Sequence, residues 1–181
     1  FEVFAVEGGT DAMCYIFDSL AVNNLLKSGD TIALMTPIFT PYLEIPHLPN
    51  YKFNVINIKA NEVDENGNPT WQYPKEELNK LKDKNIKVLF VVNPNNPASI
   101  ALSRDCKDNL ISVVKEHNPE LMIVTDDVYC TFVDNFNSLV SELPYNTLGV
   151  YSYSKYFGVT GWRLGTIFLN EKNIFNDLIK K

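Results

Sequence analysis

The chain has 181 residues, of which 45% are hydrophobic and 12% aromatic, a composition that supports one substantial buried core and excludes a disordered chain. A net charge of −6 without a cluster of Lys and Arg excludes a surface built for nucleic acid, which must replace counterions on phosphates. No apolar run is long enough to span a bilayer, so no membrane partner is expected.

The cysteines and histidines give no sign of a disulfide framework or a metal centre. Cys14, Cys106 and Cys130 are odd in number and lack a C-x-x-C spacing, and His47 and His117 stand alone. We therefore expect no metal, and a reduced, cytoplasmic setting.

The elements predicted in chain order alternate between strands and helices. Strands are expected over residues 3–6, 31–35, 52–58, 87–92, 121–125, 148–153 and 164–169. Helices are expected over residues 10–27 with Thr10 as the N-cap, 42–48, 75–84, 104–116 and from 173 onward, with a loop over 61–73. Because apolar strands such as 88–92 show no polar face, the pattern predicts an α/β fold with a mostly parallel sheet sandwiched by helices.

The two ends of the chain suggest a part of a longer protein. It begins at Phe1 without a methionine and ends in a lysine-rich helical pattern over residues 173–181. We expect one domain over residues 1–181, cut from a longer protein.

Polar residues follow three successive predicted strands. Asn96, Asp126 and Lys155 are 30 and 29 residues apart, and each interval is about one β-α-β repeat. Ligands of such sheets bind beyond the carboxyl ends of the strands. These three side chains are therefore expected at one edge of the sheet.

The segment from Tyr151 to Gly165 carries the chemistry of an aldehyde-phosphate site. The amine of Lys155 can condense with a carbonyl, while the hydroxyls of Ser152 and Ser154 and the fork of Arg163 suit a phosphate. The alternative is a strand, a Gly-rich turn and a second strand with an exposed lysine.

Three further segments each have a functional and a structural interpretation. The turn Gly8-Gly9-Thr10 can hold a phosphate at a helix N-terminus, or can be a plain turn with a threonine cap. Asn96 lies in a Pro/Asn-rich loop that is otherwise a strong turn signal. Phe39 can stack on a ring or pack in the core.

Asp126 ends an apolar strand, and Tyr129 follows three residues later. Asp127 is the competing carboxylate, but along an extended chain its side chain points to the opposite face. We prefer Asp126 as the functional group; the alternative is a helix-capping aspartate at a strand exit.

In this order and at these separations the segments resemble those of fold-type I pyridoxal-phosphate enzymes, the aspartate aminotransferase superfamily, from Phe4 to Leu169. The resemblance rests on the Gly-Gly-Thr turn, Asn-Pro-x-Asn-Pro, Asp-x-x-Tyr and Ser-x-Ser-Lys with an arginine eight residues later. It implies the large domain of such a transferase, pyridoxal 5′-phosphate (PLP) as the cofactor, and an absent N-terminal segment and C-terminal small domain. Two departures are Gly8, where many relatives have serine, and Ser99, where ordinary aminotransferases have glycine.

The resemblance also implies a role for each residue. The phosphate is held by Gly8, Gly9, Thr10, Ser152, Ser154 and Arg163. Lys155 is the catalytic residue that carries the cofactor and moves the Cα proton. Asp126 keeps the pyridine nitrogen protonated, and Tyr129 and Asn96 bond the ring oxygen. Asn96 also contacts the substrate carboxylate, and Phe39 stacks on the ring.

Longer stretches are similar to the aspartate 4-decarboxylase branch, which is bifunctional with aspartate aminotransferase. They are Val6 to Thr10, Thr36 to Glu44, Trp71 to Pro74 and Tyr153 to Gly165. This similarity implies aspartate and a 2-oxo acid as small-molecule partners, and a homodimer or larger homo-oligomer. The alternatives are an aminotransferase without decarboxylation and a PLP-binding regulatory domain that performs no turnover.

Overall fold

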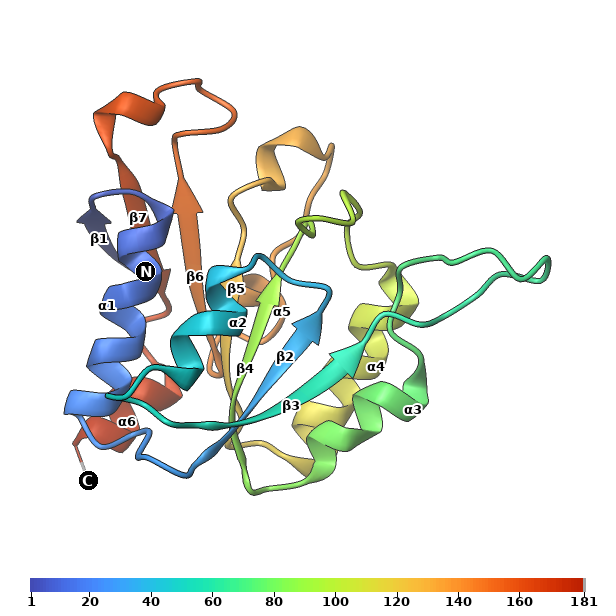
Figure 1. Ribbon diagram of the computed structural model, residues 1–181, viewed down its shortest axis with the longest axis horizontal. Helices are drawn as coiled ribbons and strands as arrows, with labels where there is room; N and C mark the ends of the chain where they lie inside the picture. The colour runs from blue at the N-terminus through green and yellow to red at the C-terminus, as the bar shows by residue number, and fades with distance from the viewer. Residues whose placement is uncertain (181) are drawn as a thin grey trace.

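The computed structural model describes residues 1–180 and arranges them as one seven-stranded sheet with helices on both faces (Figure 1). The strands lie in the order β1-β7-β6-β5-β4-β2-β3. Their bounds are β1 Glu2–Val6, β2 Thr31–Thr36, β3 Asn54–Lys59, β4 Ile86–Val92, β5 Met122–Asp126, β6 Thr147–Ser152 and β7 Gly165–Leu169. Neighbours from β6 to β3 pair in parallel and only β7 runs antiparallel to both of its neighbours, which confirms the mostly parallel sheet.

Each face of the sheet has its own core. One face is covered by α1 (Gly9–Val22), α2 (Pro41–Glu44), the 3₁₀ helix η1 (Ile45–His47) and α6 (Ile174–Ile179). The other is covered by α3 (Lys75–Leu78), the 3₁₀ helix η2 (Asn79–Lys82), α4 (Arg104–His117) and α5 (Leu139–Glu142). Phe17 of α1 stacks on Phe90 of β4 on the first face, and Leu110 of α4 is fully buried on the second. The expected sandwich of helices around the sheet is thus confirmed.

Two predicted details of the first helix are wrong. The helix begins at Gly9 with Gly8 as the N-cap, so Thr10 lies inside the first turn and caps nothing. The helix ends at Val22 and not near Lys27, because Asn24 takes a left-handed conformation with φ 58° and stops it. The predicted helix over 42–48 is divided into α2 and η1, and α5 was not predicted.

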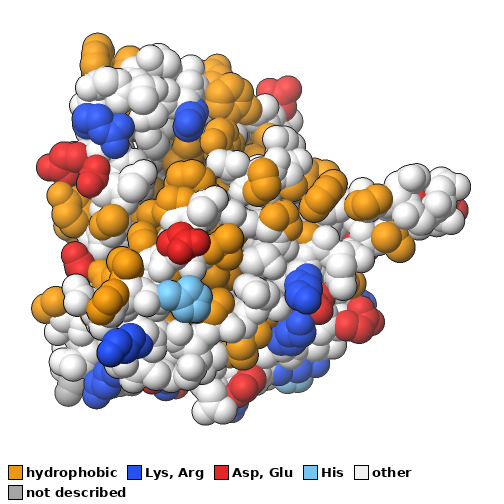
Figure 2. All heavy atoms as spheres, viewed as in Figure 1, with side chains coloured by type: hydrophobic (Ala, Val, Ile, Leu, Met, Phe, Trp, Pro, Cys, Tyr) orange, Lys and Arg blue, Asp and Glu red, His pale blue; other side chains and the backbone are white. Residues whose placement is uncertain are grey.

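Residues 61–73 form the expected loop, which projects from the body as a narrow arm (Figures 1 and 2). A single antiparallel bridge joins Val63 to Pro69 within it. Its base is held by Gln72, whose side-chain amide donates to the Ala101 carbonyl and accepts from the Ser103 backbone N–H.

No helix within residues 1–180 is long and apolar enough to cross a membrane.

The register of the sheet brings distant segments to one edge. Val92 pairs with Asp126, and Asp126 pairs with Val150, so the ends of β4, β5 and β6 lie side by side. Because β7 is antiparallel, it starts at this same edge: Gly165 pairs with both Ser152 and Val6. The turn after β1, the loop after β6 and the segment before β7 therefore meet there.

Candidate active site

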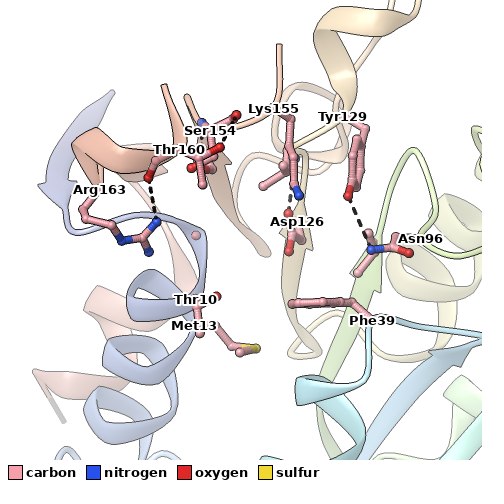
Figure 3. Close-up of a pocket in the computed structure, with 14 residues that line it drawn as sticks. Thr10, Met13, Phe39, Asn96, Asp126, Tyr129, Ser154, Lys155, Thr160 and Arg163 are labelled. Carbon is pink, nitrogen blue, oxygen red and sulfur yellow. Dashed lines mark hydrogen bonds between the residues drawn. The ribbon is translucent and has the colours of Figure 1, made fainter. Parts of the chain in front are cut away.

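A cavity of about 180 Å³ opens at this edge, and every predicted site residue except Gly8 lines it (Figure 3). The lining residues are Gly9, Thr10, Met13, Phe39, Val92, Asn96, Asp126, Val128, Tyr129, Ser152, Ser154, Lys155, Thr160 and Arg163. The sequence did not predict four of these as site residues: Met13, Val92, Val128 and Thr160. Figure 3 shows Lys155 pointing into the cavity on one side and Phe39 lying on the other.

The first turn of α1 forms one end of the cavity, and close packing there requires glycine. Gly8 has φ +100°, and a Cβ on it would lie 2.6 Å from Nη2 of Arg163. A Cβ on Gly165 would lie 2.8 Å from the carbonyl carbon of Gly8. The free backbone N–H groups of the helix start, the guanidinium and the buried Ser152 hydroxyl therefore converge at a place suited to an anion. Although it does not line the cavity, Gly8 makes room for Arg163.

Thr160 organises the loop between β6 and β7, and sequence reasoning missed it. It lies in the 3₁₀ helix η4 (Thr160–Trp162). Its hydroxyl donates to the Ser154 carbonyl at 3.0 Å, and its carbonyl accepts from Nη1 of Arg163 at 3.2 Å (Figure 3). One residue thus fixes both a predicted phosphate-binding serine and the predicted phosphate-binding arginine. Its position three residues before Arg163 was the available signal.

Asp126 lies buried at the centre of the cavity floor. Its carboxylate accepts from the Val128 backbone N–H at 3.2 Å and from the Tyr42 hydroxyl at 3.1 Å. Burial raises the pKa of Asp126 to about 6, although both hydrogen bonds act to lower it. Tyr42 is itself fully buried, and burial together with the neighbouring Asp126 carboxylate raises its pKa well above the usual value. Tyr42 is therefore a neutral hydrogen-bond donor, and sequence reasoning missed this role.

Asp127 points away from the cavity, as the alternation of side chains along a strand predicts. It accepts from the Thr125 hydroxyl at 2.7 Å and from the Ser138 hydroxyl at 2.5 Å. Burial, with a smaller contribution from the charge of Asp126, raises the pKa of Asp127 to about 7. The structure thus brings Asp126, and not Asp127, to the cavity.

The loop after β4 contains three asparagines, and only Asn96 lines the cavity. Its Nδ2 donates to the Tyr129 hydroxyl at 3.4 Å. Asn95 shapes the loop: its Nδ2 donates to the Pro37 carbonyl at 2.8 Å and its Oδ1 accepts from the Ala98 backbone N–H at 2.9 Å. The contact with Pro37 ties this loop to the segment that carries Phe39.

The arrangement fits a phosphorylated aromatic aldehyde. Gly9, Ser152 and Arg163 could hold an anion, and Figure 3 shows Arg163 across the cavity from the amine of Lys155 and the buried carboxylate of Asp126. One ligand could therefore condense with the Lys155 amine and place a ring nitrogen against the Asp126 carboxylate.

Comparison with known proteins shows the family. Residues 5–180 match the model of the aminotransferase class I and II family, and the chain belongs to this family. A bifunctional aspartate aminotransferase and L-aspartate beta-decarboxylase from Pseudomonas sp is 50% identical over 180 residues, which cover 99% of this chain and 33% of that protein. An aspartate aminotransferase from Pyrococcus horikoshii is 29% identical, with 82% of this chain and 36% of that protein covered.

Solved structures agree with the fold. A double mutant of the Thermus thermophilus aspartate aminotransferase superposes with a TM-score of 0.78 at 21% identity, covering 99% of this chain and 44% of that one. Cystalysin from Treponema denticola, which contains pyridoxal 5′-phosphate, superposes with a TM-score of 0.74 at 21% identity, covering 98% of this chain and 44% of that one. The predicted fold-type I architecture is confirmed, and the family indicates pyridoxal 5′-phosphate as the cofactor. The chain spans about a third of the length of the curated relatives that it matches.

Proposed function

We propose that this chain is the cofactor-binding part of an enzyme that converts L-aspartate to L-alanine and carbon dioxide and also transaminates aspartate. The observation that carries the chemistry is the meeting of Lys155, Asp126, Asn96 and Arg163 at one cavity. The choice of aspartate and of decarboxylation is supported by the 50% identical bifunctional relative. Pyridoxal 5′-phosphate, when bound, supplies a ring that accepts the electrons left behind by a departing proton or by carbon dioxide.

The phosphate end is proposed to use charge and backbone donors together. Arg163 offers a guanidinium that Thr160 holds in place, and Ser152 and Ser154 offer hydroxyls. The N–H groups at Gly9 and Thr10 add the positive end of the α1 dipole. Gly8 contributes the space for Arg163, while its own N–H donates to the Val6 carbonyl at 2.9 Å.

The ring end is proposed to be held from three directions. Asp126 presents a carboxylate to the ring nitrogen, and the hydrogen bond from Tyr42 favours its charged form. Phe39 would stack on one face of the ring, and Asn96 and Tyr129, already bonded to each other, would face the ring oxygen. Asn96 also contacts the substrate carboxylate.

Lys155 is proposed to act twice. Its amine, exposed in the cavity, would hold the cofactor covalently and would be freed by an incoming amino acid. The freed amine then takes the Cα proton as a general base and returns it as a general acid. The relative rates of carbon dioxide loss and of oxo-acid release set the ratio of alanine, the product of decarboxylation, to the 2-oxo acid, the product of transamination.

The rest of the protein completes the site in this proposal. A C-terminal small domain supplies the arginine for the substrate carboxylate, and a second subunit of a homodimer or larger assembly supplies a further phosphate contact. The proposal places the enzyme in the cytoplasm, with an amino acid and a 2-oxo acid as its small-molecule partners and with neither nucleic acid nor membrane.

The test uses the full-length enzyme with aspartate and no added 2-oxo acid. Sustained release of alanine and carbon dioxide is expected, because conversion of aspartate to these two products needs no acceptor for the amino group. Turnover that stops unless 2-oxo acid is added would leave an aspartate aminotransferase, the second candidate. Lys155→Ala should abolish turnover and the cofactor adduct seen by mass spectrometry after borohydride reduction; an adduct on another residue would contradict the site.

A further inference from the structure

Asp11 places a negative charge beside the arginine proposed to hold the phosphate. It lies in the first turn of α1, and its Oδ2 is 3.7 Å from Nη2 of Arg163. The two side chains remain 46% and 48% exposed. Nothing in the proposed chemistry uses this carboxylate, and its charge has the same sign as the phosphate expected at Arg163.

The surroundings of Arg163 direct it to this contact. Its Nη1 is held by the Thr160 carbonyl at 3.2 Å, and its backbone has φ 52°. The missing side chain of Gly8 leaves the space that Nη2 occupies. The guanidinium is therefore laid across the start of α1, where Nη2 faces Asp11.

Asp11 and a phosphate draw on the same two sources of attraction. A carboxylate in the first turn of a helix is stabilised by the helix dipole, as is a phosphate at the helix start. Each also gains from the guanidinium of Arg163. A phosphate that binds must share or displace the interaction between Asp11 and Arg163, and it meets the repulsion of the carboxylate.

We propose that Asp11 is an internal counter-ion of Arg163 that competes with the cofactor phosphate, so that the cofactor is held less tightly than the site would otherwise allow. This inference rests on the proposed role of Arg163 at the phosphate. Partial exposure lets water solvate Asp11 once the phosphate has taken over Arg163. The ion pair satisfies the arginine whenever the phosphate is away, and it eases release of the cofactor.

The exposure of the Asp11–Arg163 ion pair determines how much its removal should change the affinity for the cofactor. Ion pairs between solvent-exposed groups are weak, and removing one competitor of this kind corresponds to an affinity change of about threefold. Salt screens such a contact, so the change should shrink as ionic strength rises.

The experiment titrates full-length apoenzyme with pyridoxal 5′-phosphate and, separately, with pyridoxal, which lacks the phosphate. Asp11→Asn is expected to lower the Kd for pyridoxal 5′-phosphate about threefold and to leave the Kd for pyridoxal unchanged. Asp105→Asn is the matched control, because Asp105 occupies the first turn of α4 on the other face of the sheet. It should change neither Kd.

The Arg163→Gln variant separates this inference from the proposed site. If Arg163→Gln fails to weaken binding of pyridoxal 5′-phosphate, the phosphate assignment itself is wrong. If Arg163→Gln weakens binding but Asp11→Asn leaves the Kd unchanged or raises it, only the counter-ion role is overturned. That role is also overturned if Asp11→Asn tightens pyridoxal equally, or if its full gain persists in the Arg163→Gln background.

Discussion

The two ends of the cavity are built in different ways. At the ring end, Asp126 and Tyr42 are buried, lie on or beside regular elements and bond to each other. At the phosphate end, Thr10 and Arg163 are exposed and lie on a helix start and a loop. Burial makes the polar groups of the ring end costly to leave unpaired, so they are bonded to each other, whereas the phosphate end leaves its charged group accessible to a ligand.

The largest expected effect comes from removing the charge at the ring end. Asp126→Asn keeps the shape of the side chain but cannot present a negative charge to the ring nitrogen. We expect kcat/KM for aspartate to fall about a hundredfold or more, the range seen when one preorganised electrostatic group is lost. Steady-state kinetics of the full-length enzyme measures it. An unchanged kcat/KM, with a normal unfolding curve, would show that this carboxylate does not serve the ring.

The neighbouring carboxylate should affect stability instead of chemistry. The folded pKa of Asp127 is raised to about 7, so the folded state binds its proton more tightly than the unfolded chain does. Its contribution to stability is therefore fully present below the unfolded pKa of about 4 and is lost as pH rises through about 7. Asp126, raised to about 6, acts in the same direction.

Urea unfolding of full-length apoenzyme at pH 5 and pH 8 tests this dependence of stability on pH. Asp127→Asn should reduce the loss of unfolding free energy between the two pH values, because the amide does not titrate. Asp108→Asn, an exposed change on α4, serves as the control. A pH difference identical in the wild type and in Asp127→Asn would rule out the raised pKa.

At the phosphate end, packing can be broken without touching a charge. Gly165→Ala puts a Cβ 2.8 Å from the Gly8 carbonyl carbon, so backbone must move, at a cost of about 1–3 kcal/mol. We expect a lower midpoint of urea unfolding and weaker binding of pyridoxal 5′-phosphate. Gly161→Ala, where nothing lies within 4 Å of the added Cβ, should change stability little. Equal effects of the two variants would refute the close approach.

The sequence could predict the residues that strand pairing places, but not the contacts between distant side chains. The alternation of apolar strands and helices predicts the sheet, and residues that follow strands, such as Asn96 and Asp126, are brought to one edge by parallel pairing alone. Contacts between side chains far apart in the chain leave no such pattern. Tyr42 reaches Asp126 across 84 positions, and only the folded structure reveals that contact. The end of α1 was missed because its stop at Asn24 depends on one left-handed residue.

The smallest expected effect concerns a single hydrogen bond at the ring end. Tyr42→Phe removes one hydrogen bond to Asp126 and leaves the ring packed near Phe90, at a cost of about 1 kcal/mol in unfolding free energy. Since that bond lowers the pKa of Asp126, its loss should raise the pKa further, which carboxyl NMR titration of the apoenzyme can measure. Tyr51→Phe is the matched control, because Tyr51 donates to Asp18, outside the cavity. It should leave the Asp126 titration unchanged. A lower or unaltered pKa in Tyr42→Phe would mean that the buried carboxylate is held by its backbone contact with Val128 alone.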